Sequence, residues 1–355
     1  MSLVLHIIDR TTHRDMLELL SLTLKAGDRV ICLGSEPDLT GLHLPVEHAH
    51  EPMSIAALGG AYLAMHEHVC ADVVHAWSPR AAQASEAFAS KSKSRVVASM
   101  PYCPPKPMLQ QLVRLAGRGC VLTFPTSAAV EQAIRQGAPS GNVRVLPPSA
   151  VAPQDKHARR SRLREKLAVA DNHHLLVMMG QIDRDCGFRL GPWVQAILHE
   201  IRDDVRLMIA GSGDASGSLE RFISLCGQPD EVFVGGWRYD SSDVLSAADV
   251  MLHLPVGRSG VRPLSAGMAA GLPVVSSCTA EAAQIGGDAV LFAQVNDPRD
   301  SAGAVLQLLD DADKARALGQ AAALRARMTL SPQAAKDVLD AIYEQVHYLA
   351  ATDPA

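Results

Sequence analysis

Short apolar runs alternate with longer helical patterns along almost the whole chain. Most of the runs are continuously apolar rather than alternating, which is typical of parallel strands covered on both faces. The helical stretches between them supply the crossovers that parallel strands need. The sequence therefore predicts an α/β fold with doubly wound parallel sheets. The expected strands are 3–8, 29–33, 72–77, 95–99, 120–124 and 143–146 in the first half, and 174–179, 205–210, 231–234, 250–254, 273–276 and 290–292 in the second.

The length of the chain indicates two lobes, because 355 residues can bury two substantial cores. We expect the final helix to begin at Ser331 and Pro332, a standard start signal, and to pack back towards the first lobe. The expected division is a Rossmann-like lobe at 1–150, a linker with a basic helix at 151–170, a second Rossmann-like lobe at 171–330, and the C-terminal helix at 331–355.

The composition argues against nucleic acid as a partner. Aromatic residues make up only 4% of the chain, and the formal net charge is −5, so neither stacking platforms nor a general attraction to phosphate backbones is expected. The helix at 157–167 is rich in arginine, and we interpret it as a solvated face.

The location and the redox state follow from two other features. No apolar run reaches the roughly 18 residues that a membrane span needs, and the first 15 residues lack the basic start of a signal peptide. We therefore expect a cytoplasmic protein that does not contact a membrane. The seven cysteines are scattered without a C-x-x-C pair, which indicates reduced thiols rather than disulfides or a zinc site.

Residues 249–277 are the most informative segment. Their sequence, DVMLHLPVGRSGVRPLSAGMAAGLPVVSS, predicts a buried strand, a Gly-rich loop at 257–260, a helix from about Pro263 to Ala270, and a second strand after Pro273. A loop of this kind between a strand and a helix N-terminus is suited to bind an anion.

This layout resembles the donor-binding segment of family 4 glycosyltransferases, the glycosyl transferases group 1. The resemblance covers most of residues 70–348, and its motifs keep the order and spacing of the family. They include LMIAGSG at 207–213, VFVGG at 232–236, GLPVV at 271–275 and GDAVLF at 287–292. The resemblance implies a GT-B fold, in which two Rossmann-like lobes flank a cleft and a nucleotide sugar binds without a metal or other cofactor.

Five polar groups of the family pattern are absent from this sequence. The two carboxylates of the donor loop and its helix are replaced by Arg258 and Ala266. The positions of an arginine and a lysine after the first strand of the second lobe hold Gln181 and Cys186, and a histidine position in the first lobe holds Met100. The resemblance thus implies a divergent member that lacks the usual Glu-x7-Glu carboxylates, with an altered donor site or no transfer activity.

Relocated cations could replace the missing groups. Arg184 and Arg189 flank the position of the absent cations, and Ser259 could cap the following helix or contact a phosphate. The alternative is that these arginines are solvated or paired with Asp183, Asp185 and Asp214. The residues expected to bind the donor and its phosphates are Gly180, Gln181, Arg184, Gly211, Gly213, Gly257, Arg258, Ser259, Gly260 and Arg262, and Gly236 and Trp237 are expected near the base.

Histidines offer one catalytic candidate and no metal site. His75 is expected near the carboxyl end of a parallel strand, where open sheets bind ligands, although packing is an alternative role. His66 and His68 would point about 200° apart on a helix, so we expect no metal site there. The G-x-G-x-x-x-G run at 211–217 is interpreted as a tight strand-to-helix turn rather than an NAD site.

The resemblance therefore implies a retaining glycosyltransferase that moves a hexose from a nucleotide sugar to a glycan or a small acceptor. The alternative is an inactive homologue that keeps the scaffold to bind a protein partner or a glycan. The retained Gly257, Gly260, Gly271 and Pro273 favour the enzyme, since they still shape a ligand site.

Overall fold

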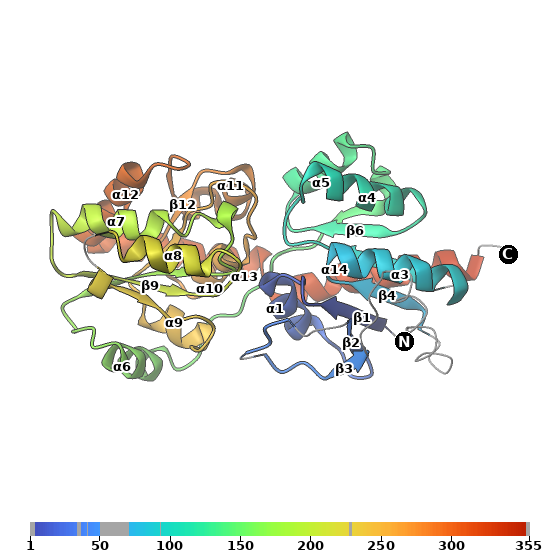
Figure 1. Ribbon diagram of the computed structural model, residues 1–355, viewed down its shortest axis with the longest axis horizontal. Helices are drawn as coiled ribbons and strands as arrows, with labels where there is room; N and C mark the ends of the chain where they lie inside the picture. Colours follow the sequence, from blue (N-terminus) through green and yellow to red (C-terminus); the bar gives the residue numbers. More distant parts are fainter. Residues whose placement is uncertain are drawn as a thin grey trace. The chain divides into compact units, whose positions relative to one another are not determined.

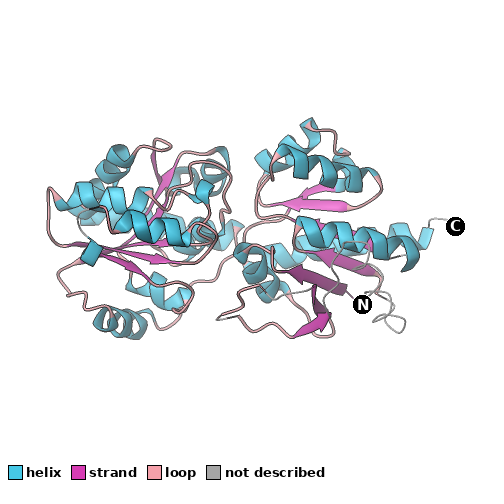
Figure 2. Ribbon diagram, in the orientation of Figure 1, coloured by secondary structure: helices cyan, strands magenta, loops and turns pink. Residues whose placement is uncertain are grey.

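The computed structural model of the chain divides into two compact units (Figure 1). The first unit comprises Met1–Pro147 and Pro332–Ala355, and the second comprises Pro148–Ser331. The structure describes residues 4–33, 37–40, 42–49, 71–92, 94–226 and 229–352, so that His66 and His68 lie outside the described residues. Each unit contains one parallel sheet with helices on both faces (Figure 2). The predicted α/β class with two Rossmann-like sheets is confirmed.

The first unit has a seven-stranded sheet in the order β3-β2-β1-β4-β5-β6-β7. The order reverses between β1 and β4, and this reversal marks the topological switch point of the sheet. The strands are β1 (Val4–Asp9), β2 (Arg29–Leu33), β3 (Val46–Ala49), β4 (Val73–Ala76), β5 (Arg95–Ser99), β6 (Val121–Phe124) and β7 (Val143–Val145). Every pair is parallel.

Alternate residues of each strand in the first unit enter opposite cores. Leu5 and Ile7 of β1 pack with one set of helices, whereas Val4 and Ile8 pack with the other set. Helices α3 (Pro79–Ser92), α4 (Lys106–Gly117) and α5 (Ser127–Arg135) cover the first face, and α1 (Arg14–Thr23) and α14 (Pro332–Thr352) cover the second. The C-terminal helix α14 contacts α1, β4 and β5, and therefore belongs to the core of the first unit.

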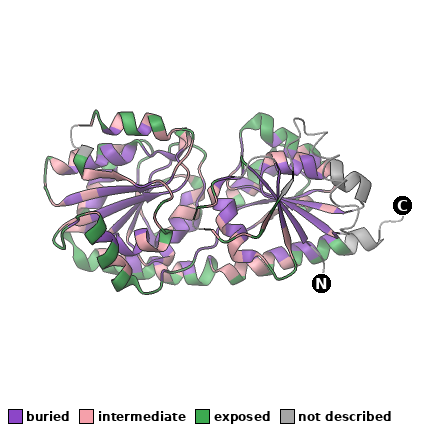
Figure 3. Cartoon of the chain, turned by 60° about the horizontal axis from the view of Figure 1, so that its bottom comes forward, coloured by how far each residue is buried: buried purple, intermediate pink, exposed green. Residues whose placement is uncertain are grey.

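The second unit has a six-stranded sheet in the order β10-β9-β8-β11-β12-β13. Its strands are β8 (His174–Met179), β9 (Val205–Ala210), β10 (Val232–Val234), β11 (Val250–His253), β12 (Val274–Ser277) and β13 (Leu291–Ala293). The four central strands β8, β9, β11 and β12 are buried, as expected for parallel strands between two helix layers, whereas the edge strand β10 is only partly buried (Figure 3).

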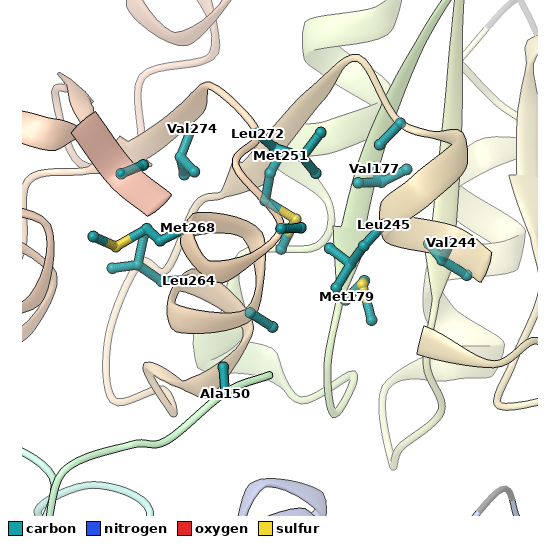
Figure 4. Close-up of a cluster of buried hydrophobic side chains, with 14 of the residues drawn as sticks. Ala150, Val177, Met179, Val244, Leu245, Met251, Leu264, Met268, Leu272 and Val274 are labelled. Atoms are coloured by element: carbon teal, nitrogen blue, oxygen red, sulfur yellow. The ribbon is translucent and has the colours of Figure 1, made fainter. Parts of the chain in front are cut away.

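Two helix layers cover this second sheet. Helices α7 (Leu190–His199), α8 (Ser216–Ile223) and α12 (Pro298–Asp310) pack on one face. Helices α6 (Lys156–Lys166), α9 (Ser241–Ala247), α10 (Arg262–Ala269), α11 (Ala280–Gly286) and α13 (Ala312–Thr329) pack on the other. In this second layer Leu264 and Met268 of α10 point into the same apolar cluster as Met251 of β11 (Figure 4). The packing fixes α10 and the loop before it against the sheet.

The basic helix α6 corrects one expectation from the sequence. Its arginines are not merely a solvated face, because they pair with two carboxylates of the second unit. Arg159 and Arg162 contact Asp243 at 2.5 and 2.7 Å, and Arg164, only 3% exposed, contacts Asp249 at 3.2 Å. The positive charge of α6 therefore holds the helix against α9 and the start of β11.

Two absences concern the described residues only. No helix in the described ranges combines the length and the apolarity that crossing a membrane requires. Six cysteines of that part of the chain form no disulfide: Cys32, Cys103, Cys120 and Cys186 are buried, Cys226 is partly exposed, and Cys278 is exposed.

Candidate functional site

The loops after β8, β9 and β11 meet at the carboxyl edge of the second sheet. The three strands are neighbours in the order β9-β8-β11, so the loops that follow them come to the same edge. Open parallel sheets bind their ligands at this edge. The edge collects most of the residues predicted to bind the donor.

The loops after β8 and β9 approach each other through backbone atoms. A Cβ atom added at Gly211 would lie 1.9 Å from the carbonyl oxygen of Gly180, and one added at Gly213 would lie 2.6 Å from that of Ile182. The backbone N–H of Ile182 also donates to the carbonyl of Ser212, at 2.9 Å. The Gly211 and Gly213 positions are therefore required by loop packing, and no dinucleotide needs to be invoked to explain them.

The loops after β8 and β11 are also joined by their backbones. The N–H groups of Val256 and Gly257 both donate to the carbonyl of Asp185, at 2.9 and 3.1 Å. Gly187 has a φ of +70°, and a Cβ atom there would lie 1.7 Å from the carbonyl oxygen of Leu254. These contacts fix the 257–260 loop relative to β8.

His253 holds the other end of the 257–260 loop. This buried side chain places Nε2 3.2 Å from the carbonyl oxygen of Gly260 and Nδ1 3.0 Å from the hydroxyl of Ser276. A carbonyl can only accept, so Nε2 carries a hydrogen atom. His253 was not among the residues predicted for the site, since a single histidine at a strand end has no distinguishing pattern.

The N-terminus of α10 differs from the expected cap. Val261, not Ser259, occupies the N-cap position, and no side chain caps the first turn. The hydroxyl of Ser259 instead lies 3.4 Å from the sulfur of Cys186, so its predicted capping role is wrong. An uncapped first turn leaves N–H groups and the positive end of the helix dipole available to an anion.

Two predicted cations lie beside this helix start. Arg262 is the first residue of α10, and Arg258 projects from the loop with half of its side chain exposed. Arg258 Nη2 is 3.7 Å from a carboxylate oxygen of Asp185, but this pair is exposed and therefore weak. A ring atom of Pro263 would lie 3.1 Å from a Cβ atom at Gly180, which brings the start of α10 against the end of β8.

Other predicted residues lie elsewhere on the second unit. Arg184 and Arg189 line a separate hollow beside α7 and α8, and Gln181 is half-buried at the end of β8. Gly236 has a φ of +59° in the turn after β10, where Trp237 is partly exposed. Arg258 and Arg262 therefore both belong to the segment that leads into α10, whereas Arg184 lines the hollow beside α7 and α8.

His75 is completely buried in the first unit, which does not fit the predicted catalytic role. Its Nε2 lies 2.7 Å from the hydroxyl of Ser99, and its ring stacks on Trp77 with centroids 4.1 Å apart. Burial, with a smaller effect from His6, holds the pKa of His75 well below its usual value. The imidazole is therefore a neutral packing group inside the unit.

The loop after β1 holds two polar residues that sequence reasoning did not select. The carboxylate of Asp9 is buried and accepts hydrogen bonds from the N–H of Thr11, at 2.6 Å, and from the hydroxyl of Ser78, at 2.8 Å. Asp9 thereby ties the β1 loop to the start of α3 at the switch point of the sheet. The available signal was their position directly after the first strand, because open parallel sheets bind ligands where such strands end.

His13 follows in the same loop and caps α1. Its Nδ1 accepts a hydrogen bond from the N–H of Asp15 at 3.2 Å, which assigns the ring hydrogen to Nε2. The side chain is 7% exposed, and Nε2 has no hydrogen-bond partner among the described residues. Tyr102 meets the ring edge-on, with centroids 5.7 Å apart. His13 is thus an oriented donor at the carboxyl edge of the first sheet.

The described residues contain no group of three or more histidine, cysteine, aspartate or glutamate side chains placed to hold a metal ion.

Comparison with known proteins finds a family match within the second unit. Residues 174–311 match the family described as glycosyl transferases group 1. We call this matched segment the group 1 domain. No curated protein matches the sequence of the chain.

Solved structures extend the similarity to both units. Anabaena HepE in complex with UDP and glucose shares 16% identity over 97% of this chain and 100% of its own, with a TM-score of 0.85. Sucrose-phosphate synthase from Thermosynechococcus elongatus shares 16% identity over 99% of this chain and 100% of its own, with a TM-score of 0.75. WaaG, a glycosyltransferase involved in lipopolysaccharide biosynthesis, shares 17% identity over 96% of this chain and 99% of its own, with a TM-score of 0.71. The chain therefore has the GT-B fold.

Two of the replaced positions in the group 1 domain are buried. Cys186 packs with the α7 and α8 layer, and Ala266 packs with the α10 layer. Neither side chain offers a charge or a hydrogen-bond acceptor to a nucleotide.

Proposed function

We propose that the chain is a glycosyltransferase that moves a hexose from a nucleotide sugar to a glycan or a small acceptor. The observation that carries this proposal is the fixed 257–260 loop, which ends at an uncapped helix with Arg258 and Arg262 beside it. The group 1 domain and the UDP bound by HepE support a nucleotide sugar as the donor.

The diphosphate would bind at this helix start. Its charge grows as the bond between the sugar and the phosphate breaks, because the electron pair of that bond goes to the phosphate. N–H groups of the first turn and the two arginines would stabilise that charge, so the transfer is proposed to need no metal. An acceptor hydroxyl would form the new bond to the anomeric carbon, with retention of configuration as the family resemblance implies, and its proton would go to an oxygen of the departing diphosphate.

The predicted contacts of the sugar nucleotide follow the loop arrangement. Gly180, Gly211 and Gly213 would let the phosphates approach the backbone, and Gly236 and Trp237 would lie near the base. His13 would contact the acceptor from the first unit, since its Nε2–H is an oriented donor. A cytoplasmic location remains a prediction from the sequence.

The second candidate is an inactive homologue that binds a protein partner or a glycan. The apolar character of Cys186 and Ala266 favours it, because both positions lack the polar groups of the family pattern. The two candidates differ in one property: only the transferase must bind a nucleotide.

Thermal unfolding with UDP, GDP, ADP and their sugar conjugates tests this difference. A nucleotide at a hundred times its dissociation constant adds about 2.7 kcal/mol of stability, which should raise the Tm by several degrees. Arg258→Ala should remove most of the shift, whereas Arg299→Ala, an exposed arginine on α12, should not. The absence of a shift with every nucleotide would exclude the transferase and leave the inactive homologue.

A further inference from the structure

A hollow of about 600 Å³ lies between the loop after β8 and the first turns of α7 and α8. It lies entirely within the second unit. Its floor is apolar, with Ile182, Phe188 and Leu219 buried beneath it. The volume falls within the range of small-molecule sites, which combine apolar walls with a few polar groups.

Two aromatic rings form one wall of this hollow. Trp193 of α7 and Phe222 of α8 lie with ring centroids 5.9 Å apart and planes inclined by 47°. Trp193 is 49% exposed, which is unusual for the largest apolar side chain of a helix that otherwise packs on the sheet. A flat, exposed indole face offers a stacking surface for a flat or chair-shaped ring.

Two arginine side chains line the edge of this hollow. The guanidinium of Arg189 lies 4.9 Å above the ring of Phe222, and Arg184 is exposed on the loop after β8. Among the described residues, neither makes a hydrogen bond or an ion pair. Asp183 is the one carboxylate of the described lining, so the lining carries a net charge of +1 from two arginines and one aspartate. Arginine binds carboxylate and phosphate groups in a planar, bidentate manner.

Neutral hydrogen-bonding groups complete the lining. The hydroxyl of Ser218 donates to the carbonyl of Ala215 at 2.8 Å and keeps its lone pairs as acceptors. Asn296, which is exposed and has a φ of +61°, also lines the hollow. Ser218, Asn296 and Asp183 suit the hydroxyl groups of a ligand.

We propose that this hollow binds a sugar ring that carries an anionic group, either a carboxylate or a phosphate. The ring stacks on Trp193, its hydroxyls bond to Asp183, Ser218 and Asn296, and its anion binds Arg184 and Arg189. The hollow borders the 257–260 loop at Val256 but is not lined by residues 257–260, and it binds its ligand without a nucleotide. It would hold an acidic sugar or part of an acidic glycan against the second unit.

The intrinsic tryptophan fluorescence of the full chain reports on this site. The three tryptophans differ in position: Trp77 is buried in the first unit, Trp237 lies after β10, and Trp193 is exposed in the hollow. Titration with glucuronate or glucose 6-phosphate should quench the emission in a saturable manner. Glucose should bind at least tenfold more weakly, because it offers no group to the arginines.

Variants separate the proposed site from other sources of binding. Arg184→Ala and Arg189→Ala should each weaken binding of the charged sugar about tenfold, while Arg221→Ala, an exposed arginine of α8 outside the hollow, should leave it unchanged. Trp193→Leu should abolish the quenching and, by calorimetry, the binding itself. A stronger response to glucuronate would identify a carboxylate ligand, and a stronger response to glucose 6-phosphate a phosphate ligand.

Three results would overturn the proposal. The first is equal binding of glucose and glucuronate, which would remove the role of the arginines. The second is binding that survives Trp193→Leu. The third is displacement of the sugar by UDP in the Arg258→Ala variant, which would make the hollow a nucleotide site. Failure of nucleotide binding at the 257–260 loop would leave this proposal intact, since the two sites are measured separately.

Discussion

Nδ1 of His75 lies 2.6 Å from the hydroxyl oxygen of Tyr343, which joins β4 to the C-terminal helix α14 across 268 residues of sequence. Both side chains are buried. On the other side of the imidazole, the hydroxyl of Ser99 contacts Nε2 and, at 2.6 Å, the hydroxyl of Thr123. A row of polar groups therefore runs from β6 to α14 beneath that helix and specifies how it packs on the first unit.

Tyr343→Phe should destabilise the first unit by about 1–3 kcal/mol. The phenylalanine keeps the apolar contacts of the ring but leaves a buried nitrogen of His75 without its partner. Urea unfolding of the two proteins measures the difference. Glu344→Gln, on the exposed side of α14, is the matched control and should change the stability by less than about 0.5 kcal/mol. Equal stabilities of Tyr343→Phe and the parent would show that the hydrogen bond contributes nothing.

The buried, neutral His75 should make the stability depend on pH below about 6.5. Burial lowers the pKa of His75 in the folded chain, so the unfolded chain takes up a proton near pH 6.5 while the folded chain does not. The stability that the neutral His75 contributes is fully present above that pH. It is lost as the pH falls towards the lower pKa of His75 in the folded chain. The slope reaches at most about 1.4 kcal/mol per pH unit for one proton.

Urea unfolding between pH 7.5 and 5 of the parent and of His75→Gln isolates this effect from the other histidines. The variant should lose part of the decrease in unfolding free energy at acid pH. The exposed His157→Gln serves as the control and should keep the parental slope. Parallel curves for the parent and His75→Gln would contradict the interpretation.

Gly211→Ala should destabilise the second unit by about 3 kcal/mol or more. The added Cβ atom would lie 1.9 Å from the carbonyl oxygen of Gly180, so one of the two loops must move. Gly217→Ala is the matched control, because a Cβ atom there meets no atom within 4 Å on helix α8. That variant should be neutral or more stable by up to about 1 kcal/mol.

Measuring both the thermal unfolding and the nucleotide binding of Gly211→Ala tests the contact between the two loops in two ways. The distorted loop after β9 should weaken nucleotide binding as well as stability, whereas Gly217→Ala should weaken neither. Unchanged stability in both variants would show that the loops after β8 and β9 are looser than the structure indicates.

Asp249→Asn should destabilise the second unit by about 3 kcal/mol. One carboxylate oxygen of Asp249 accepts from the backbone N–H of Leu175 at 2.7 Å and contacts Arg164, and the other contacts Arg160. The substitution leaves the buried guanidinium of Arg164 without its counter-charge. Asp171→Asn, an exposed residue before β8, is the control in the same urea experiment. A loss below about 0.5 kcal/mol would show that the backbone carbonyls around Arg164 suffice to hold it.

Continuous apolar runs made most strands predictable from the sequence. A strand such as β8 is buried on both faces, so its sequence has few polar residues and its limits are distinct. Strand β3 was missed because it lies at the sheet edge and its sequence VEHA carries two polar residues. Edge strands are covered less completely, and their sequences are less distinctive.

The site was less predictable, because its geometry depends on contacts between distant loops. The glycines at 211 and 213 carried a recognisable pattern, but the reason for it, the carbonyl oxygens of 180 and 182, is visible only in three dimensions. Likewise, the arginines of α6 look solvated until Asp243 and Asp249 are seen to face them. The single histidines 13 and 253 have no periodicity to reveal them.

His13→Asn should separate the capping role of His13 from its proposed contact with the acceptor. The asparagine side chain can accept from the N–H of Asp15 as Nδ1 does, so the stability should stay within about 0.5 kcal/mol of the parent. It lacks the Nε2–H donor, and the transfer rate kcat/KM for the acceptor should therefore fall about tenfold or more. His13→Ala removes both groups and should cost about 1 kcal/mol of stability in addition. Equal kcat/KM values for the parent and His13→Asn would limit His13 to its capping role, and the donor at the edge of the first sheet would have to be another group.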